Sequence, residues 1–220
     1  MRERGRYIVV EGPIGVGKRE LAEMLAMELD ARLMLEQGEE NPFLADFYAS
    51  GMRNSFQTQL YFLLHRWKQQ EELIQPDLFN RNVVSDYLFS RDQIFAELTL
   101  SAHELRLYNQ IREQLVREIV KPDLVVYMWA PFDVLLRRVQ KRPRKMHEAP
   151  NSEYLDRVVR SFNDFFFNYH ETPLLMVNVG QVNLFERPEE FRLLFEKIQS
   201  IRGGVHYFNP SAVLQFDRLK

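Results

Sequence analysis

Cysteine is absent from the chain, and so are long apolar runs. The lack of cysteine excludes disulfide bonds, cysteine-ligated zinc, iron–sulfur clusters and a thiol nucleophile. The five histidines are dispersed and do not form the H-E-x-x-H spacing of zinc proteases. The longest uncharged stretches, such as residues 172–185, contain proline, asparagine and glycine and are too short to span a bilayer. The first residues form no apolar leader, so we expect a soluble cytoplasmic protein without a membrane partner.

Charge of neither sign dominates the chain. Its 220 residues include 29 basic and 31 acidic side chains, which give a formal net charge of -2. A general nucleic-acid-binding protein is usually basic, so no nucleic-acid partner is expected. The 45% hydrophobic content is ordinary for a globular chain of this length. We therefore expect one domain over residues 1–210 and a tail over residues 211–220.

Short apolar runs alternate with amphipathic segments along the chain. Strands that alternate with helices indicate an α/β fold with a parallel sheet. The pattern predicts strands over 7–11, 33–36, 82–86, 124–129 and 174–179. It predicts helices over 18–29, 56–74, 104–120, 133–141, 154–169 and 188–201. The segment from residue 203 onward has no assigned structure.

A glycine-rich loop connects the first expected strand to the first expected helix. Glycines let the backbone approach an anion closely, and the following helix N-terminus favours negative charge. The loop lysine can bridge the β- and γ-phosphates of a bound triphosphate. The order of strand, glycines, lysine and helix therefore predicts a site for ATP phosphates, formed by Gly12, Pro13, Ile14, Gly15, Val16, Gly17, Lys18 and Arg19.

Arg19 breaks the usual pattern of this loop. The position after the lysine normally holds serine or threonine, whose hydroxyl binds Mg²⁺. An arginine cannot bind a metal ion and adds a second cation beside Lys18. Two interpretations follow: other carboxylates, phosphates and water hold the metal, or phosphoryl transfer is impaired.

Ordered segments over most of the chain resemble the deoxynucleoside kinase family. They are the phosphate loop with its preceding glutamate (11–18) and the segments 40–48, 56–59, 84–89 and 138–144. The resemblance implies a P-loop kinase fold with a five-stranded parallel sheet, a basic lid over about 138–150 and a homodimer. It also implies ATP and Mg²⁺ as cofactors and a deoxynucleoside as the phosphate acceptor.

Two carboxylates end expected strands on the loop side of the sheet. By resemblance, Asp86 is the general base, and Glu36 lies near the substrate 5′-hydroxyl; both are candidate Mg²⁺ ligands. Without the resemblance, Asp86 could equally cap a turn and Glu36 could be a solvated acid. Many family members place arginine directly after the base, whereas this chain has Tyr87. Arg91 is a candidate to supply the missing phosphate contact.

A polar helix face is the candidate site for the nucleobase. Gln59 and Arg66 are seven residues apart and therefore lie on one face of a helix. By resemblance, Gln59 binds the base, Arg66 with Asp92 tunes which base is accepted, and Tyr48 contacts the sugar 3′-hydroxyl. On pattern alone, these residues could instead be a satisfied buried glutamine, an ordinary ion pair and a core aromatic.

A basic run follows the helix expected over 133–141. Cations suit helix C-termini, so a solvated helix end is one interpretation. By resemblance, Arg138, Arg142 and Arg144 are lid residues that stabilise the transferring phosphoryl group. Glu148 matches the lid acid that reaches the sugar 3′-hydroxyl, or His147 does if the match is displaced by one residue.

The residues and the resemblance together favour 5′-phosphorylation of a deoxynucleoside by ATP. The segments 40–44 and 85–89 are most similar to bacterial kinases of purine deoxynucleosides, so deoxyadenosine or deoxyguanosine is favoured over deoxycytidine. A nucleoside monophosphate kinase is one alternative. A catalytically impaired homologue that binds nucleotide or a partner is the other, because Arg19 and Tyr87 both change phosphate contacts.

Overall fold

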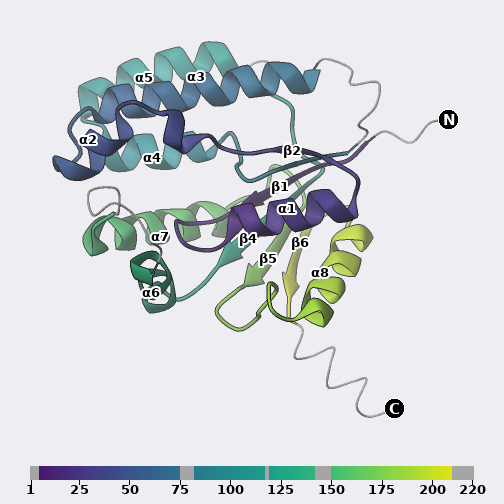
Figure 1. The fold of residues 1–220 in the computed structure, drawn as a ribbon. Helices are drawn as coiled ribbons and strands as arrows, with labels where there is room; N and C mark the ends of the chain where they lie inside the picture. Colours follow the sequence, from purple (N-terminus) through teal and green to yellow (C-terminus); the bar gives the residue numbers. More distant parts are fainter. Residues whose placement is uncertain (1–4, 75–81, 117–118, 142–149, 210–220) are drawn as a thin grey trace, which may run out of the picture.

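A six-stranded parallel sheet forms the centre of the protein (Figure 1). The computed structural model describes residues 5–74, 82–116, 119–141 and 150–209. The strands are arranged in the order β2-β3-β1-β4-β5-β6, and every neighbouring pair is parallel. Their bounds are β1 Tyr7–Glu11, β2 Arg32–Met34, β3 Val83–Ser85, β4 Leu124–Trp129, β5 Leu174–Asn178 and β6 Val205–Phe208.

The expectation of five strands is wrong, because β6 extends the sheet beyond β5. Val205 lies opposite Leu174, and the pairing continues to Phe208 opposite Val177. Only Phe208 is buried in this strand, whereas Tyr207 is 68% exposed. An edge strand with one buried side chain gives almost no hydrophobic pattern, so the sequence did not predict it.

Eight α-helices are present in the described ranges. Two of them, α2 and α4, were not predicted from the sequence pattern. Their bounds are α1 Lys18–Glu28, α2 Leu44–Ala49, α3 Ser55–Ile74, α4 Arg91–Thr99, α5 Ala102–Leu115, α6 Phe132–Lys141, α7 Ser152–Phe167 and α8 Pro188–Ser200, with a short 3₁₀ turn at Gly38–Glu40. In Figure 1, α3 and α5 lie side by side on the outer side of the sheet. No helix in the described ranges is long and apolar enough to cross a membrane.

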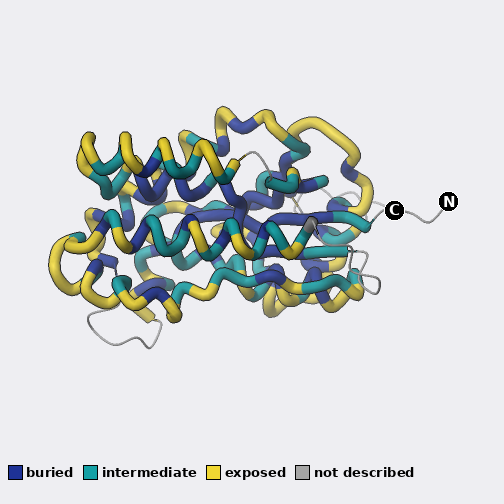
Figure 2. Tube along the Cα trace, turned by 90° about the horizontal axis from the view of Figure 1, so that it is seen from above, coloured by how far each residue is buried: buried dark blue, intermediate teal, exposed yellow. Residues whose placement is uncertain are grey.

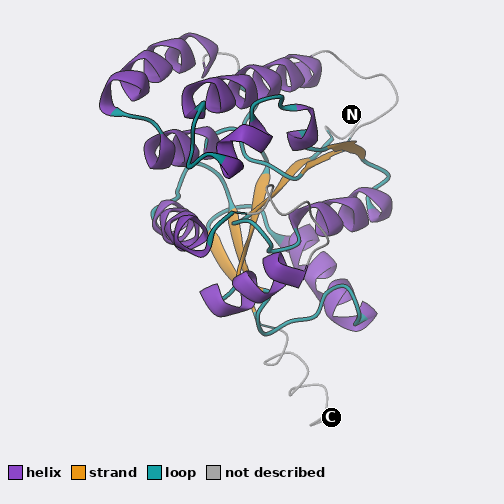
Figure 3. Cartoon of the chain, turned by 60° about the vertical axis from the view of Figure 1, so that its left-hand side comes forward, coloured by secondary structure: helices purple, strands orange, loops and turns teal. Residues whose placement is uncertain are grey.

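Alternate strand residues pack into two cores on opposite faces of the sheet. Ile8 and Val126 belong to the core that α1 and α8 complete. Val9 and Tyr127 belong to the core that α4 and α7 complete. Successive side chains of a strand point to opposite faces, which explains this division. Figure 2 shows the buried strands along the middle and exposure on the outer faces of the helices, and Figure 3 shows helices on both sides of the sheet.

The parallel topology brings several loops to one edge of the sheet. Strands β1, β3 and β2 are neighbours, and the phosphate loop, Asp86 and Glu36 follow their carboxyl ends. Ligands of open α/β sheets bind outside the carboxyl ends of the strands. The fold therefore gathers the candidate phosphate and carboxylate residues at one place.

Candidate active site

The phosphate loop lies close against the end of β4. A Cβ atom at Gly12 would lie 2.2 Å from the carbonyl oxygen of Met128, so only glycine fits there. Gly17 has φ 98° and ψ 29°, a left-handed conformation directly before α1. Glycine adopts this conformation at little cost, so the chain can turn sharply from the loop into the helix. The glycines thus shape a tight strand-to-helix turn of the kind that binds phosphate.

Lys18 folds back over this loop. Its Nζ donates hydrogen bonds to the carbonyl oxygens of Gly12, at 2.7 Å, and Pro13, at 3.3 Å. Burial and the positive charge of Arg91 lower the pKa of Lys18 to about 8. The ammonium group is therefore held at the mouth of the loop, where phosphate charge would stabilise its protonated form.

Glu11 joins the phosphate loop to the chain after β3. It is fully buried, and its two oxygens accept hydrogen bonds from Gly12 N, at 2.8 Å, and Leu88 N, at 2.7 Å. Burial raises the pKa of Glu11, although Arg91 and Lys18 oppose the shift. This carboxylate fixes the loop relative to the segment that carries Asp86. The sequence analysis assigned it no separate role, because it reads only as the end of an apolar strand.

Asp86 lies directly after β3, as expected, and is 6% exposed. Its Oδ1 accepts a hydrogen bond from Glu36 N at 2.7 Å. Burial raises the pKa of Asp86, and the negative charge of Glu36 adds to the rise despite its amide hydrogen bond. An oriented carboxylate with a raised pKa is suited to accept a proton.

Glu36 is held by two arginines. Its Oε1 accepts hydrogen bonds from Nε of Arg66 at 2.8 Å and from Nη2 of the same residue, and its Oε2 lies 3.1 Å from Nη2 of Arg91. Burial alone would raise the pKa of Glu36, but the two arginines outweigh it and lower the value to about 2. Glu36 is therefore ionised and strongly bound to the protein.

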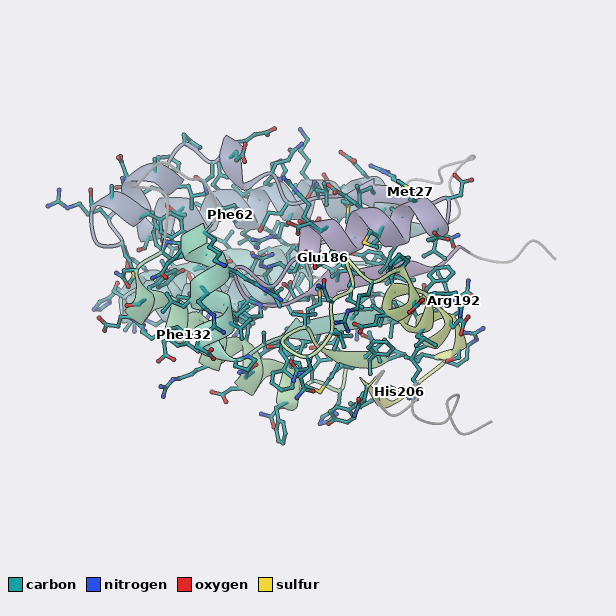
Figure 4. The ribbon with its side chains drawn as sticks, turned by 60° about the horizontal axis from the view of Figure 1, so that its bottom comes forward. Met27, Phe62, Phe132, Glu186, Arg192 and His206 are labelled. Atoms are coloured by element: carbon teal, nitrogen blue, oxygen red, sulfur yellow. The ribbon has the colours of Figure 1, made fainter. Side chains whose placement is uncertain are left out.

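Arg66 connects Glu36 to the residues expected to form the base pocket. Its Nη1 forms an ion pair with Asp92, which is 1% exposed, so the expected Arg66–Asp92 pair is confirmed. The Arg66 guanidinium lies 5.2 Å from the ring centroid of Phe62, which Figure 4 labels on α3, and 5.7 Å from that of Tyr87. Gln59 is buried on the same helix, at 4% exposure. The structure thus joins Arg66 to both Glu36 and Asp92, and it buries Gln59 on the same helix as Arg66.

Tyr48 and Arg138 lie on other elements around the same edge. The Tyr48 ring on α2 packs edge-on against Phe47 and Tyr154, with centroid distances of 5.2 Å and 6.3 Å. On α6, Arg138 Nη2 donates to the carbonyl oxygen of Val179 at 2.8 Å. Burial lowers the pKa of Arg138. In this arrangement Arg138 is tied to the end of β5.

Comparisons with known proteins identify the family. The deoxynucleoside kinase model matches residues 8–201 of the chain. The chain belongs to the deoxynucleoside kinase family. The deoxyguanosine kinase of Bacillus subtilis is 36% identical over 157 residues, which cover 71% of this chain and 76% of that protein. The deoxyadenosine kinase of Lactobacillus acidophilus is 28% identical and covers 89% of this chain and 98% of its own length.

Solved structures of deoxynucleoside kinases share the fold. A deoxyadenosine kinase from M. mycoides with bound dATP superimposes with a TM-score of 0.76 at 21% identity. The match covers 89% of this chain and 100% of that chain. Together with the family match, this similarity confirms the α/β kinase fold and identifies the chain as a kinase.

Part of the expected kinase site lies outside the described residues. This is the case for Arg142, Arg144 and Glu148, and with them most of the lid expected over 138–150. The tail over residues 211–220 also lies outside the described part of the chain. The roles of these residues stay predictions from the resemblance.

Proposed function

We propose that this kinase transfers the γ-phosphoryl group of ATP to the 5′-hydroxyl of a purine deoxynucleoside. The observation that carries the proposal is the position of Asp86, oriented by the Glu36 amide at the strand end next to the phosphate loop. A carboxylate there can take the hydroxyl proton while Lys18 stabilises the phosphoryl charge. Residues 12–19 hold the ATP phosphates, and the arginines of the lid segment add positive charge.

Magnesium would be held mainly by phosphate oxygens and water in this proposal. Within the described ranges, no group of three or more histidine, aspartate or glutamate side chains could bind a metal ion by itself. Mg²⁺ usually keeps several waters and needs only one or two carboxylates beside substrate phosphates. Asp86 would fit that role through metal-bound water, whereas both oxygens of the second candidate, Glu36, already bind Arg66 and Arg91. The ion would neutralise charge on the phosphates.

The purine preference rests on relatives and on the base pocket. The curated relatives of this chain include deoxyguanosine and deoxyadenosine kinases. In the proposal, Gln59 binds the base edge, the Arg66–Asp92 pair shapes the pocket, and Tyr48 contacts the sugar. A cytoplasmic location and a homodimer belong to the same proposal. Leu64 and Leu107, which are 45% and 50% exposed on α3 and α5, offer apolar surface for a second subunit.

The direct test is turnover with ATP, Mg²⁺ and each of the four deoxynucleosides, with products separated by chromatography. We expect deoxyadenosine or deoxyguanosine to give the 5′-monophosphate at the highest kcat/KM. Thymidylate and deoxyadenylate serve as parallel acceptors. Turnover of a monophosphate in place of a nucleoside would favour a nucleoside monophosphate kinase. ATP binding without any product would favour the impaired homologue, with Arg19 and Tyr87 as the cause.

Arg19→Thr is expected to strengthen the use of magnesium. Arg19 is exposed and its Nη2 donates to the carbonyl oxygen of Glu36 at 3.3 Å, so its charge lies beside the proposed metal region. Removing that charge and adding a hydroxyl should lower the half-saturating Mg²⁺ concentration about fivefold, equivalent to roughly 1 kcal/mol. The measurement is kcat as a function of free Mg²⁺.

A suitable control for Arg19→Thr is Arg160→Thr, which removes an exposed arginine of α7 that pairs with Asp156. This control should leave the magnesium dependence unchanged. If Arg19→Thr and Arg160→Thr give the same magnesium curve as the wild type, Arg19 does not weaken metal retention.

A further inference from the structure

Arg91 is a buried cation at the first position of α4. It is 6% exposed, and it follows the end of β3 by only a few residues. Burying a guanidinium group is costly unless charges and hydrogen bonds compensate for the lost water. The contacts of Arg91 therefore show whether each N–H group of its guanidinium has an acceptor within the protein.

Only part of the Arg91 guanidinium makes close polar contacts within the protein. Nη2 lies 3.1 Å from Glu36 Oε2, whereas Nη1 lies 3.8 Å from Glu11 Oε1, which is too long for a hydrogen bond. Within the described part of the chain, the buried Nε and Nη1 atoms have no hydrogen-bond partner. Arg66, by comparison, donates hydrogen bonds to Glu36 from two nitrogen atoms, and its Nη1 forms an ion pair with Asp92.

The Arg91 guanidinium lies in the same site as Lys18 and Asp86. Both carboxylates that face Arg91 are site residues, because Glu11 holds the phosphate loop and Glu36 binds Asp86 through its amide. The positive charge of Arg91 is also among the causes that lower the pKa of Lys18 and oppose the rise in the pKa of Asp86. Nη1 and Nε of this buried cation make no hydrogen bond in the described part of the chain, although Nη1 faces Glu11 and the guanidinium lies 5.3 Å from the Phe95 ring centroid.

Tyr87, the residue directly after Asp86, does not supply a cation to the site. Tyr87 is fully buried and carries no positive charge. Its ring lies against the Arg66 guanidinium, within the cluster of aromatic residues beside β1 and β4. Tyr87 is therefore a packing residue, and Arg91 is the cation that the turn after β3 places in the site.

We propose that Arg91 is a catalytic residue whose free Nε–H and Nη1–H groups donate hydrogen bonds to the transferring γ-phosphoryl group. The inference rests on the proposed function. In the step, the bond from the γ-phosphorus to the β,γ-bridging oxygen breaks and the bond to the 5′-oxygen forms. The hydroxyl proton goes to Asp86, and ADP leaves with the bridging oxygen. Glu11 and Glu36 hold the guanidinium in place, so that it stabilises charge without reorganisation.

The test compares Arg91→Met and Arg91→Lys with the wild type in steady-state turnover. Arg91→Met should lower kcat about 100-fold, as expected for the loss of one preorganised donor group, while the KM of the deoxynucleoside changes less than about twofold. Arg91→Lys keeps the charge but not the two donors, so its kcat should fall about tenfold. Guanidinium ion at non-denaturing concentration should restore part of the activity of Arg91→Ala.

Arg6→Met is the matched structural control. Arg6 is a partly buried arginine whose guanidinium donates to the carbonyl oxygens of Ile198 and Ile201, next to the amino end of β1. This variant should lose thermal stability but keep the kcat of its folded fraction. The Arg91 variants should lose kcat at full folded fraction, as measured by circular dichroism.

Each outcome separates the inference from the proposed function. Wild-type turnover tests the function first, and its absence would overturn both. With an active wild type, an unchanged kcat in Arg91→Lys and Arg91→Met would overturn the role of Arg91 alone. A loss of activity that only follows a loss of folded protein, as in Arg6→Met, would also overturn it. If Arg91→Met does not fold, the kcat of Arg91→Lys alone tests the proposed role of Arg91, and an unchanged value overturns it.

Discussion

Asp86→Asn should lower kcat by about 1,000-fold, because an amide cannot accept the 5′-hydroxyl proton. The substitution keeps the size of the side chain and leaves an Oδ1 acceptor for the Glu36 amide, which Asp86 now binds at 2.7 Å. Steady-state kinetics with the preferred deoxynucleoside measure the effect. The KM of the deoxynucleoside should change little, because the base and sugar contacts are intact.

The pH profile identifies the reason for the loss in Asp86→Asn. Burial raises the pKa of Asp86 above that of an ordinary aspartate. A general base works only when it is ionised, so kcat/KM should fall as the pH is lowered through this raised pKa. The pH profile of Asp86→Asn should lack this fall in kcat/KM at low pH, the acidic limb of the profile. An unchanged acidic limb in the variant would show that another group accepts the proton.

Asp123→Asn is the control for Asp86→Asn. Asp123 also accepts a backbone amide hydrogen bond, from Tyr7 N at 2.8 Å, but at the opposite end of β1. Removing this carboxylate should affect stability and leave kcat unchanged. Equal losses of kcat in Asp86→Asn and Asp123→Asn would contradict a specific role for Asp86.

Lys18→Met should lower kcat/KM for ATP by about 1,000-fold, since it removes a cation that stabilises the phosphoryl charge. The side chain already lies over the loop, 2.7 Å from the carbonyl oxygen of Gly12. Lys121→Met removes an exposed lysine from the segment before β4 and should be neutral. A Lys18 variant as active as this control would show that the loop binds phosphate through its backbone alone.

The pH profile of kcat/KM for ATP should also fall at high pH in the wild-type enzyme, because Lys18 loses its proton. Burial lowers its pKa to about 8 in the ligand-free protein, so the free enzyme loses this charge as the pH rises above 8. Bound phosphates stabilise the protonated form. We therefore expect kcat/KM for ATP to fall above pH 8 while kcat stays flatter. A flat kcat/KM up to pH 10 would contradict the assignment.

Local patterns predicted the central strands and the phosphate loop well. Residues 124–129 form β4 as expected, because an uninterrupted apolar run is typical of a strand buried on both faces. The pattern did not reveal α4, which begins with the two buried charged residues Arg91 and Asp92. A helix covered on several sides has no clear polar face, so helical periodicity is weak.

The sequence named the candidate site residues, whose roles stay predictions, but it did not indicate the contacts between them. Pattern and resemblance placed Asp86 and Glu36 as the last residues of strands, and the structure has them just beyond the ends of β3 and β2. The bond between the Asp86 carboxylate and the Glu36 amide joins residues 50 positions apart, and no local signal indicates it. No local signal indicates that Glu11 accepts a hydrogen bond from the Leu88 amide, or that Arg91 is buried. These features arise only when distant strands come together.

The strand order also sets when the phosphate loop can form during synthesis. Strand β1 pairs with β3 and β4, and Tyr7 binds Asp123, 116 residues further along the chain. At about 5–20 residues per second, the ribosome needs on the order of 10 s to deliver those partners. Until then, the apolar run Ile8, Val9 and Val10 is unpaired and exposed to aggregation. Gly12 also lacks the Met128 carbonyl that it packs against, so the phosphate loop cannot take its final shape until β4 has been synthesised.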